Sequence, residues 1–202
     1  MNRVASFSVL LLLINLFAAS GYADLRSDFE SAHASFLSFF DDNKDKYFDT
    51  AWEQFEQLDA QHPDHPAVQT YYGALETIKA NRVLMPWSKI KWAERGLDRI
   101  DRAMTLLGPE HVKENLIGIP VATDSRIAAT TTLLAVPGFM NRIEDAKAVF
   151  ADLLDTTDME SMPAVVQHRI YQLGVDIANK SDDKQQLEEW SGRRDAVVDN
   201  SQ

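Results

Sequence analysis

The sequence contains no cysteine. This absence excludes a disulfide framework, a metal site built from thiolates, and a lipoprotein anchored through a modified cysteine. A chain without disulfides has to be stabilised by its hydrophobic core, and 202 residues are enough to build one. For an exported protein, the lack of cysteine favours a bacterial periplasmic setting over a eukaryotic extracellular one, where disulfides are common.

Basic residues are also scarce. There are 20 Lys and Arg residues against 31 Asp and Glu residues, and the formal net charge is −11. A surface with this balance repels the phosphates of nucleic acids and the head groups of anionic lipids. We therefore expect no nucleic-acid partner.

Catalytic motifs are missing as well. The sequence has no HExxH, no GxSxG and no glycine-rich phosphate loop. His62 and His65 are three residues apart, but the intervening Pro63 places them in a turn that does not aim two imidazoles at one metal ion. Glu30 and His33 form a single Glu-x-x-His pair, whereas a two-metal helical site needs a second pair. We expect no catalytic residue, no metal and no cofactor, and we rank an enzyme with an unrecognised helical site last.

A long apolar run occurs only at the N-terminus. Residues 1–23 have the features of a secretory signal peptide, with Arg3 before an apolar stretch over 9–17 and small residues up to Ala23, after which we expect cleavage. The alternative is an uncleaved membrane anchor, but the run is shorter than the ~20 residues that a spanning helix needs. We expect a periplasmic or secreted protein with no stable membrane anchor after cleavage. Loss of Arg3 would make the mature chain more acidic still.

After the N-terminal segment, apolar residues recur every three or four positions, as in amphipathic helices. The clearest case is the stretch 88–107. Its predicted buried face consists of Ile90, Ala93, Leu97, Ile100, Met104 and Leu107. Ser88 is predicted as the N-cap, and Gly108-Pro109 as the stop signal.

The same spacing predicts helices along the rest of the chain. They cover about 24–42 and 46–58, from Pro66 to before Pro86, about 111–119, from a cap at Thr123 or Asp124 to before Pro137, and about 139–153, 163–179 and 185–198. No segment alternates as a strand would, and the β-branched Thr130–Thr132 run lies between helical flanks. We predict an all-α fold of antiparallel helical hairpins, with one domain over 24–198 and a frayed tail over 199–202.

Several small and aromatic residues recur with the spacing of a helical repeat. They are Ala51, Phe55, Leu58, Pro63 and Tyr72-Gly73, followed later by Ala146, Phe150 and Leu153. This pattern resembles the second helix of one tetratricopeptide repeat (TPR) followed by the first helix of the next. In such a repeat, Ala51 lets helices approach, Phe55 fills the groove between them, and Gly73 is a point of close packing.

The region 48–155 also resembles a group of secreted TPR-like bacterial proteins of unassigned function. The resemblance rests on Tyr72-Gly73-Ala74, Lys91, Gly96, Asp101-Arg102-Ala103, Pro137, Phe139 and Arg142. An insertion over 82–87 and a long connection over 110–122 depart from the repeat, which favours a compact helical bundle or a degenerate α-solenoid over an uninterrupted superhelix. A TPR-like fold implies binding of peptides or partner proteins on a concave surface, not catalysis.

The predicted binding surface is a basic stripe on the 88–107 helix. Its candidate residues are Lys91, Arg95, Arg99 and Arg102 along one edge, Trp92 on the flank, and Arg142 from the later part of the TPR-like region. Such a stripe would bind an acidic peptide or a carboxylate through charge-assisted hydrogen bonds. The alternative is a solvated helix face, with Asp98 and Arg102 as an ordinary i,i+4 ion pair.

Two functions follow as hypotheses. The first is a non-catalytic adaptor or scaffold in the periplasm that binds an unknown protein or peptide partner. The second is a binder of a small anionic ligand, held in a pocket between helices by Arg95, Arg99 or Arg142. A deep pocket with a buried, unpaired arginine would favour the ligand, and a shallow groove lined by aromatic residues would favour the adaptor.

Overall fold

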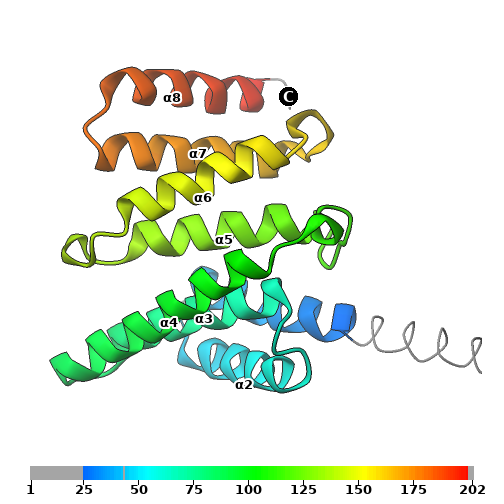
Figure 1. Cartoon of the computed structure of the whole chain (residues 1–202), viewed down its shortest axis with the longest axis vertical. Helices are drawn as coiled ribbons and strands as arrows, with labels where there is room; N and C mark the ends of the chain where they lie inside the picture. Colours follow the sequence, from blue (N-terminus) through cyan, green and yellow to red (C-terminus); the bar gives the residue numbers. More distant parts are fainter. Residues whose placement is uncertain (1–24, 43, 200–202) are drawn as a thin grey trace, which may run out of the picture. The chain divides into compact units, whose positions relative to one another are not determined.

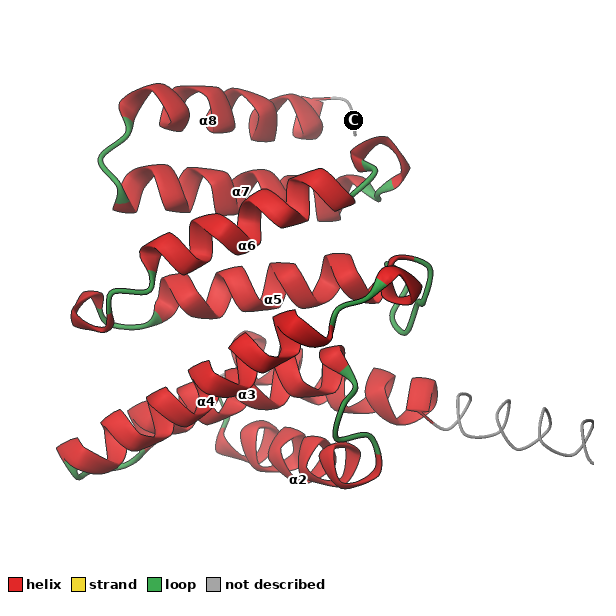
Figure 2. Ribbon diagram, viewed as in Figure 1, coloured by secondary structure: helices red, strands yellow, loops and turns green. Residues whose placement is uncertain are grey.

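A computed structural model describes residues 25–42 and 44–199 (Figure 1). The predicted signal peptide over 1–23 and most of the predicted frayed tail over 199–202 lie outside these residues. Within the described ranges the chain forms helices and loops, which confirms the all-α prediction (Figure 2). The chain divides into two compact units, one ending at Gln61 and the other beginning at His62, and each is described by itself. The prediction of a single domain stays a prediction.

The first unit is a hairpin of two helices, one over residues 25–42 and the other, α2, over Asp45–Gln61. Aromatic rings hold the two together. Phe29 meets Phe55 edge-on at 5.8 Å between ring centroids, and Phe39 meets Phe48 at 5.7 Å. Because the start of the first helix meets the end of the second, the helices are antiparallel, as the sequence predicts.

The second unit contains α3 (Pro66–Arg82), α4 (Pro86–Leu106), α5 (Val121–Ala135), α6 (Ile143–Thr156), α7 (Ala164–Lys180) and α8 (Lys184–Asp199), with short 3-10 helices η1 (Pro109–Val112), η2 (Gly138–Met140) and η3 (Met159–Ser161). Consecutive helices pack as the hairpins α3–α4, α5–α6 and α7–α8 (Figure 1). Helix α5 also packs against α3 and α7 and so connects the three hairpins. None of the described helices is long and apolar enough to cross a membrane.

The α3–α4 hairpin is closed by two glycines that face each other. A Cβ atom added to Gly96 would lie 2.5 Å from the carbonyl oxygen of Gly73 and 2.8 Å from the main-chain nitrogen of Thr77. A Cβ atom added to Gly73 would lie 2.7 Å from the carbonyl oxygen of Gly96. The two main chains are therefore in direct contact, and the predicted role of Gly73 in close packing is confirmed.

Replacing Gly96 by Ala is expected to lower the free energy of unfolding by about 2 kcal/mol, because the added methyl group has to push two main chains apart. Chemical denaturation of the purified variant measures this change. The matched control is Gly192→Ala on α8, where an added Cβ meets no atom within 4 Å. There alanine is expected to stabilise by about 0.5–1 kcal/mol through helix propensity. Equal effects at the two positions would contradict the close contact.

Two predicted helix starts are wrong. Helix α4 begins at Pro86, with Met85 and not Ser88 at the N-cap, because proline suits the first helical position. Helix α5 begins at Val121 with Pro120 at the N-cap, so neither Thr123 nor Asp124 caps it. Both of these side chains are buried in its first turn instead.

Two predictions about the connections are also wrong. Beyond η1 the segment predicted as a helix over 111–119 forms turns, and the chain pairs with itself in an isolated bridge between Asn115 and Pro120. Phe139 does not begin the next helix but lies in η2, where 77% of it is exposed. Asn141 follows in the left-handed conformation (φ 52°), which redirects the chain before α6 begins.

Candidate functional site

The predicted basic stripe on α4 faces a buried carboxylate on α3. Glu76 has no exposed surface, and two arginines of the stripe reach it from α4. The Arg99 Nε donates a hydrogen bond to Glu76 Oε2 at 3.1 Å. The Arg95 Nε forms an ion pair with Oε1 at 2.6 Å. Since an isolated buried carboxylate is costly, the two guanidinium groups balance the charge of Glu76 inside the hairpin.

Arg99 is the centre of this network. Its Nη1 donates a second hydrogen bond, to Gln69 Oε1 at 2.7 Å, and its guanidinium carbon lies 4.4 Å from the centre of the Tyr72 ring. Arg99 thus binds a carboxylate, an amide and an aromatic face from one helix. The three partners on α3 are buried, and the Arg99 side chain keeps 16% of its surface exposed.

The other stripe residues lie in different surroundings. Arg102 pairs with Asp64 at 2.5 Å, and Arg142 pairs with Asp101 at 2.5 Å and with Asp145. The Trp92 ring is contacted by the Lys79 Nζ at 4.4 Å and by the Arg95 guanidinium at 5.1 Å. Lys91 is exposed.

The structure therefore brings Arg95, Arg99 and Trp92 together and places Arg102 and Arg142 against separate carboxylates. All four arginines of the predicted site have an acidic partner within the chain. Binding of a partner at this stripe stays a prediction. Glu76 was not among the predicted site residues, although it is the only acidic residue in α3 and lies between the apolar residues Leu75 and Ile78 on a mostly uncharged stretch.

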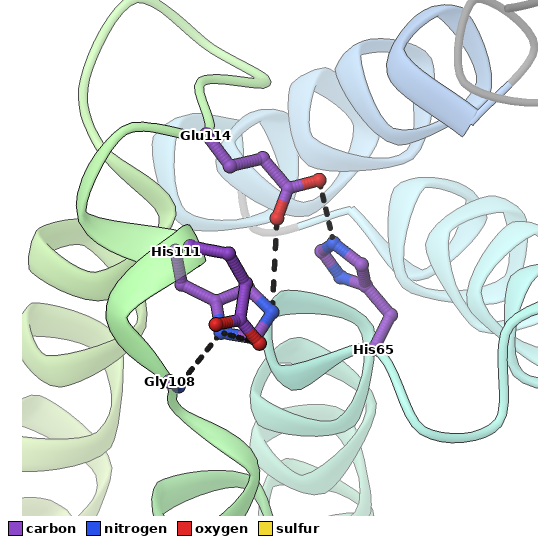
Figure 3. A network of polar contacts seen from close by, with 5 residues as sticks. His65, Gly108, His111 and Glu114 are labelled. Atoms are coloured by element: carbon purple, nitrogen blue, oxygen red, sulfur yellow. Dashed lines mark hydrogen bonds and ion pairs between the residues drawn. The ribbon is translucent and has the colours of Figure 1, made fainter.

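A second polar cluster joins the start of α3 to the loop after α4 (Figure 3). The Glu114 carboxylate lies between two imidazoles, with Oε1 at 3.2 Å from His65 Nε2 and Oε2 at 3.8 Å from His111 Nε2. The main-chain N–H of Gly108 donates to His111 Nδ1 at 2.8 Å. Because Nδ1 accepts this bond, the proton of neutral His111 lies on Nε2, facing Glu114.

The side chain of His65 is largely buried in this cluster. Burial lowers the pKa of its imidazole, and the adjacent Glu114 carboxylate opposes this only in part. Its Nδ1 atom is buried and makes no hydrogen bond. In the part of the chain that the structure describes, no group of three or more His, Asp and Glu side chains is arranged to hold a metal ion. The contacts of this cluster hold the loop between α4 and α5 against the start of α3.

A third polar pair is fully buried between α3 and α5. The Tyr71 hydroxyl donates a hydrogen bond to Asp124 Oδ1 at 2.9 Å. Burial raises the pKa of Asp124 to about 7, and the hydrogen bond from Tyr71 acts in the opposite direction. Burial also raises the pKa of Tyr71 well above its ordinary value, and the charge of Asp124 adds to this effect.

The surface is hollowed where α4 approaches the α5–α6 connection. A cavity of about 260 Å³ is lined mainly by apolar side chains from α3, α4 and the end of α5, and a cavity of about 280 Å³ adjoins it. The two share Ile90, Phe139 and Met140, and together we call them the α4–η2 groove. Ile90 is 45% exposed, although the helical spacing predicts it in the core. The groove therefore presents large apolar side chains to solvent.

One end of the α4–η2 groove is acidic. Glu94, Asp98 and Arg142 line the second cavity. Arg142 is paired with Asp101 and Asp145, whereas Glu94 and Asp98 are exposed and form no ion pair with another described residue. A further hollow of about 320 Å³ lies over α6, α7 and α8. Its largest apolar side chains, Phe150 and Trp190, are buried in the core. Of these hollows, only the α4–η2 groove combines exposed apolar groups with carboxylates that have no partner among the described residues.

Comparison with known proteins adds no assignment to this geometry. No protein family matches the chain, and neither the curated proteins nor the solved structures give a match.

Proposed function

We propose that the protein is a non-catalytic, TPR-like adaptor of the periplasm that binds a segment of a partner protein in the α4–η2 groove. The helical hairpins and the contact of α5 with its neighbours support the comparison with helical repeats, which present binding surfaces between adjacent units. The periplasmic setting rests on the features of residues 1–23.

The observation that carries the proposal is the exposure of Phe139 beside a cavity. An aromatic side chain that is 77% exposed is costly to leave in water, and exposed aromatics next to a hollow are typical anchors of protein interfaces. Ile90 and Met140 flank it in the same groove. Both cavities of the groove are open to solvent on one side, which suits a peptide segment better than a small enclosed ligand.

The charges of the groove indicate the chemistry of the segment. Glu94 and Asp98 lie one turn apart at one end, where a Lys or Arg of the partner would pair with them. The apolar end accepts a large aliphatic or aromatic side chain. The expected partner segment therefore carries a basic residue close to an apolar one.

Selection from a random peptide library displayed on phage, with the purified protein as bait, tests this proposal. We expect the selected peptides to combine Lys or Arg with a large apolar residue. Phe139→Asp is expected to raise the Kd of these peptides at least about tenfold, because it removes the anchor and adds a charge to the groove. Asp98→Lys is also expected to raise the Kd of these peptides, because the new lysine repels their basic residue.

Val165→Asp is the matched control, since Val165 is 75% exposed at the start of α7 and lines neither cavity of the groove. It should leave the Kd unchanged. Fluorescence anisotropy of a labelled peptide gives these values. Peptides that bind Phe139→Asp as tightly as the unsubstituted protein would disprove the groove as the binding site.

The alternative, a small anionic ligand held by arginines, would have to displace carboxylates of the chain itself. Arg95 and Arg99 already contact Glu76, and Arg142 contacts Asp101 and Asp145. None of these arginines is both buried and without an acidic partner in the described chain. The geometry thus favours the adaptor.

A further inference from the structure

The loop that joins α3 to α4 carries large apolar side chains in solvent. We call residues 83–87 the α3–α4 tip. Leu84 is 90% exposed, Trp87 is 69% exposed, and Met85 between them is half-exposed. The tip lies at the free end of its hairpin (Figure 1), and none of these three side chains lines one of the hollows described above. It is a protrusion and not a pocket.

The charge around the tip is opposite in sign to that of the whole protein. From Thr77 to Ala93 the sequence contains no acidic residue but four basic ones, Lys79, Arg82, Lys89 and Lys91. Three of these basic residues are exposed and lie close to the tip in the sequence: Arg82, Lys89 and Lys91. The net charge of the chain is −11, yet these three exposed basic residues flank the apolar tip, and we call them the basic collar.

This combination fits a lipid bilayer better than a protein partner. A protein that accepts Leu84 and Trp87 would need matching pockets, whereas a bilayer accepts any protruding apolar group. Tryptophan prefers the boundary between head groups and acyl chains, because its ring is apolar and its N–H is polar. Lys and Arg residues beside an inserted loop pair with anionic head groups.

We propose that the α3–α4 tip inserts reversibly into the surface of an anionic lipid bilayer, with Leu84, Met85 and Trp87 at the level of the acyl boundary and the basic collar at the head groups. The net negative charge of the protein opposes binding elsewhere on its surface, so contact is confined to the tip. This inference does not depend on the α4–η2 groove. Together the two sites would hold a partner segment close to a membrane.

Flotation of the purified protein without residues 1–23, which the sequence predicts to be cleaved, tests the proposal with vesicles. Vesicles of phosphatidylethanolamine and phosphatidylglycerol should bind the protein, vesicles of phosphatidylcholine should bind it much more weakly, and added salt should release it. The double variant Leu84→Asp, Trp87→Asp is expected to lose at least about tenfold in binding to the anionic vesicles. Both side chains are exposed, so the fold is retained, and circular dichroism verifies this.

Two controls separate this surface from others. Val165→Asp changes an equally exposed side chain far along the sequence and should bind vesicles normally. Phe139→Asp should also bind vesicles normally, so failure of the groove and failure of the tip are distinguishable. A shift of tryptophan emission to shorter wavelength on vesicle binding, lost in Trp87→Phe, is expected for insertion of this ring.

Three results would overturn the proposal. The first is absence of binding to anionic vesicles. The second is equal binding to neutral and anionic vesicles, because the basic collar would then have no role. The third is selection of peptides whose Kd depends on Leu84 and Trp87 and not on Phe139, which would make the tip a docking site for protein.

Discussion

Replacing Glu76 by Gln is expected to lower the free energy of unfolding by about 3–5 kcal/mol, the usual cost of removing one partner from a buried ion pair. The carboxylate is fully buried and is the acidic partner of both Arg95 and Arg99. An amide in its place leaves the partly buried Arg99 guanidinium without a counter-charge. Urea denaturation of the two proteins measures the difference from their midpoints and slopes.

Glu188→Gln on α8 is the control, because Glu188 is exposed and its substitution should change stability by no more than ~0.5 kcal/mol. The double variant Glu76→Gln, Arg99→Gln should be less destabilised than the sum of the single variants, since it removes both charges together. Additive effects, or a cost for Glu76→Gln as small as that for Glu188→Gln, would show that the network contributes little to the hairpin.

The stability of the protein is expected to depend on pH through Asp124. The folded state keeps this carboxyl group protonated up to a pKa of about 7, whereas the unfolded state ionises near the ordinary value of 3.8. The contribution of Asp124 is therefore fully present below pH 3.8 and is lost as the pH rises towards 7. Asp124→Asn does not lose this contribution. Between pH 3.8 and 7, its free energy of unfolding is therefore expected to rise by on the order of 4 kcal/mol relative to that of the unsubstituted protein.

Measuring both proteins by urea denaturation at a series of pH values from acid to neutral isolates this effect. His65 acts in the opposite direction, because its lowered pKa makes the folded state lose stability as the pH falls below the ordinary histidine value. Its contribution is the same in both proteins and cancels in their difference. Asp155→Asn, at an exposed position, should show no such change with pH. If the difference in free energy of unfolding between Asp124→Asn and the unsubstituted protein does not change with pH, Asp124 is ionised in the folded state over this range.

Helices α2, α4 and α6 were predictable because each has a clear apolar face along one side. In α2, the residues predicted on the buried face, Phe48, Ala51, Phe55 and Leu58, are all buried. The errors fall at helix ends and connections, where proline residues determine the position at which a helix begins. Pro86 and Pro120 each set a helix start that a search for polar caps placed further along the chain. Proline is the stronger signal here, with Pro86 at the first helical position and Pro120 at the N-cap.

The candidate site was less predictable, because its contacts join distant parts of the chain. Arg99 and Glu76 are 23 residues apart, and Arg142 and Asp101 are 41 apart. Helical spacing places the arginines on one edge of α4 but does not reveal the carboxylates that face them. Phe139 was predicted at the start of the following helix because it continues the helical spacing of that helix. Only the short η2 turn, ended by Asn141, moves it into solvent.

The contact between Gly73 and Gly96 also has a mechanical consequence. Side chains between helices can change rotamer and allow sliding, but two touching main chains have no such freedom. Helices α3 and α4 are therefore expected to behave as one rigid unit near their crossing point. A displacement of the loop between them is therefore expected to move both helices together, because the contact at Gly73 and Gly96 prevents one helix from sliding past the other.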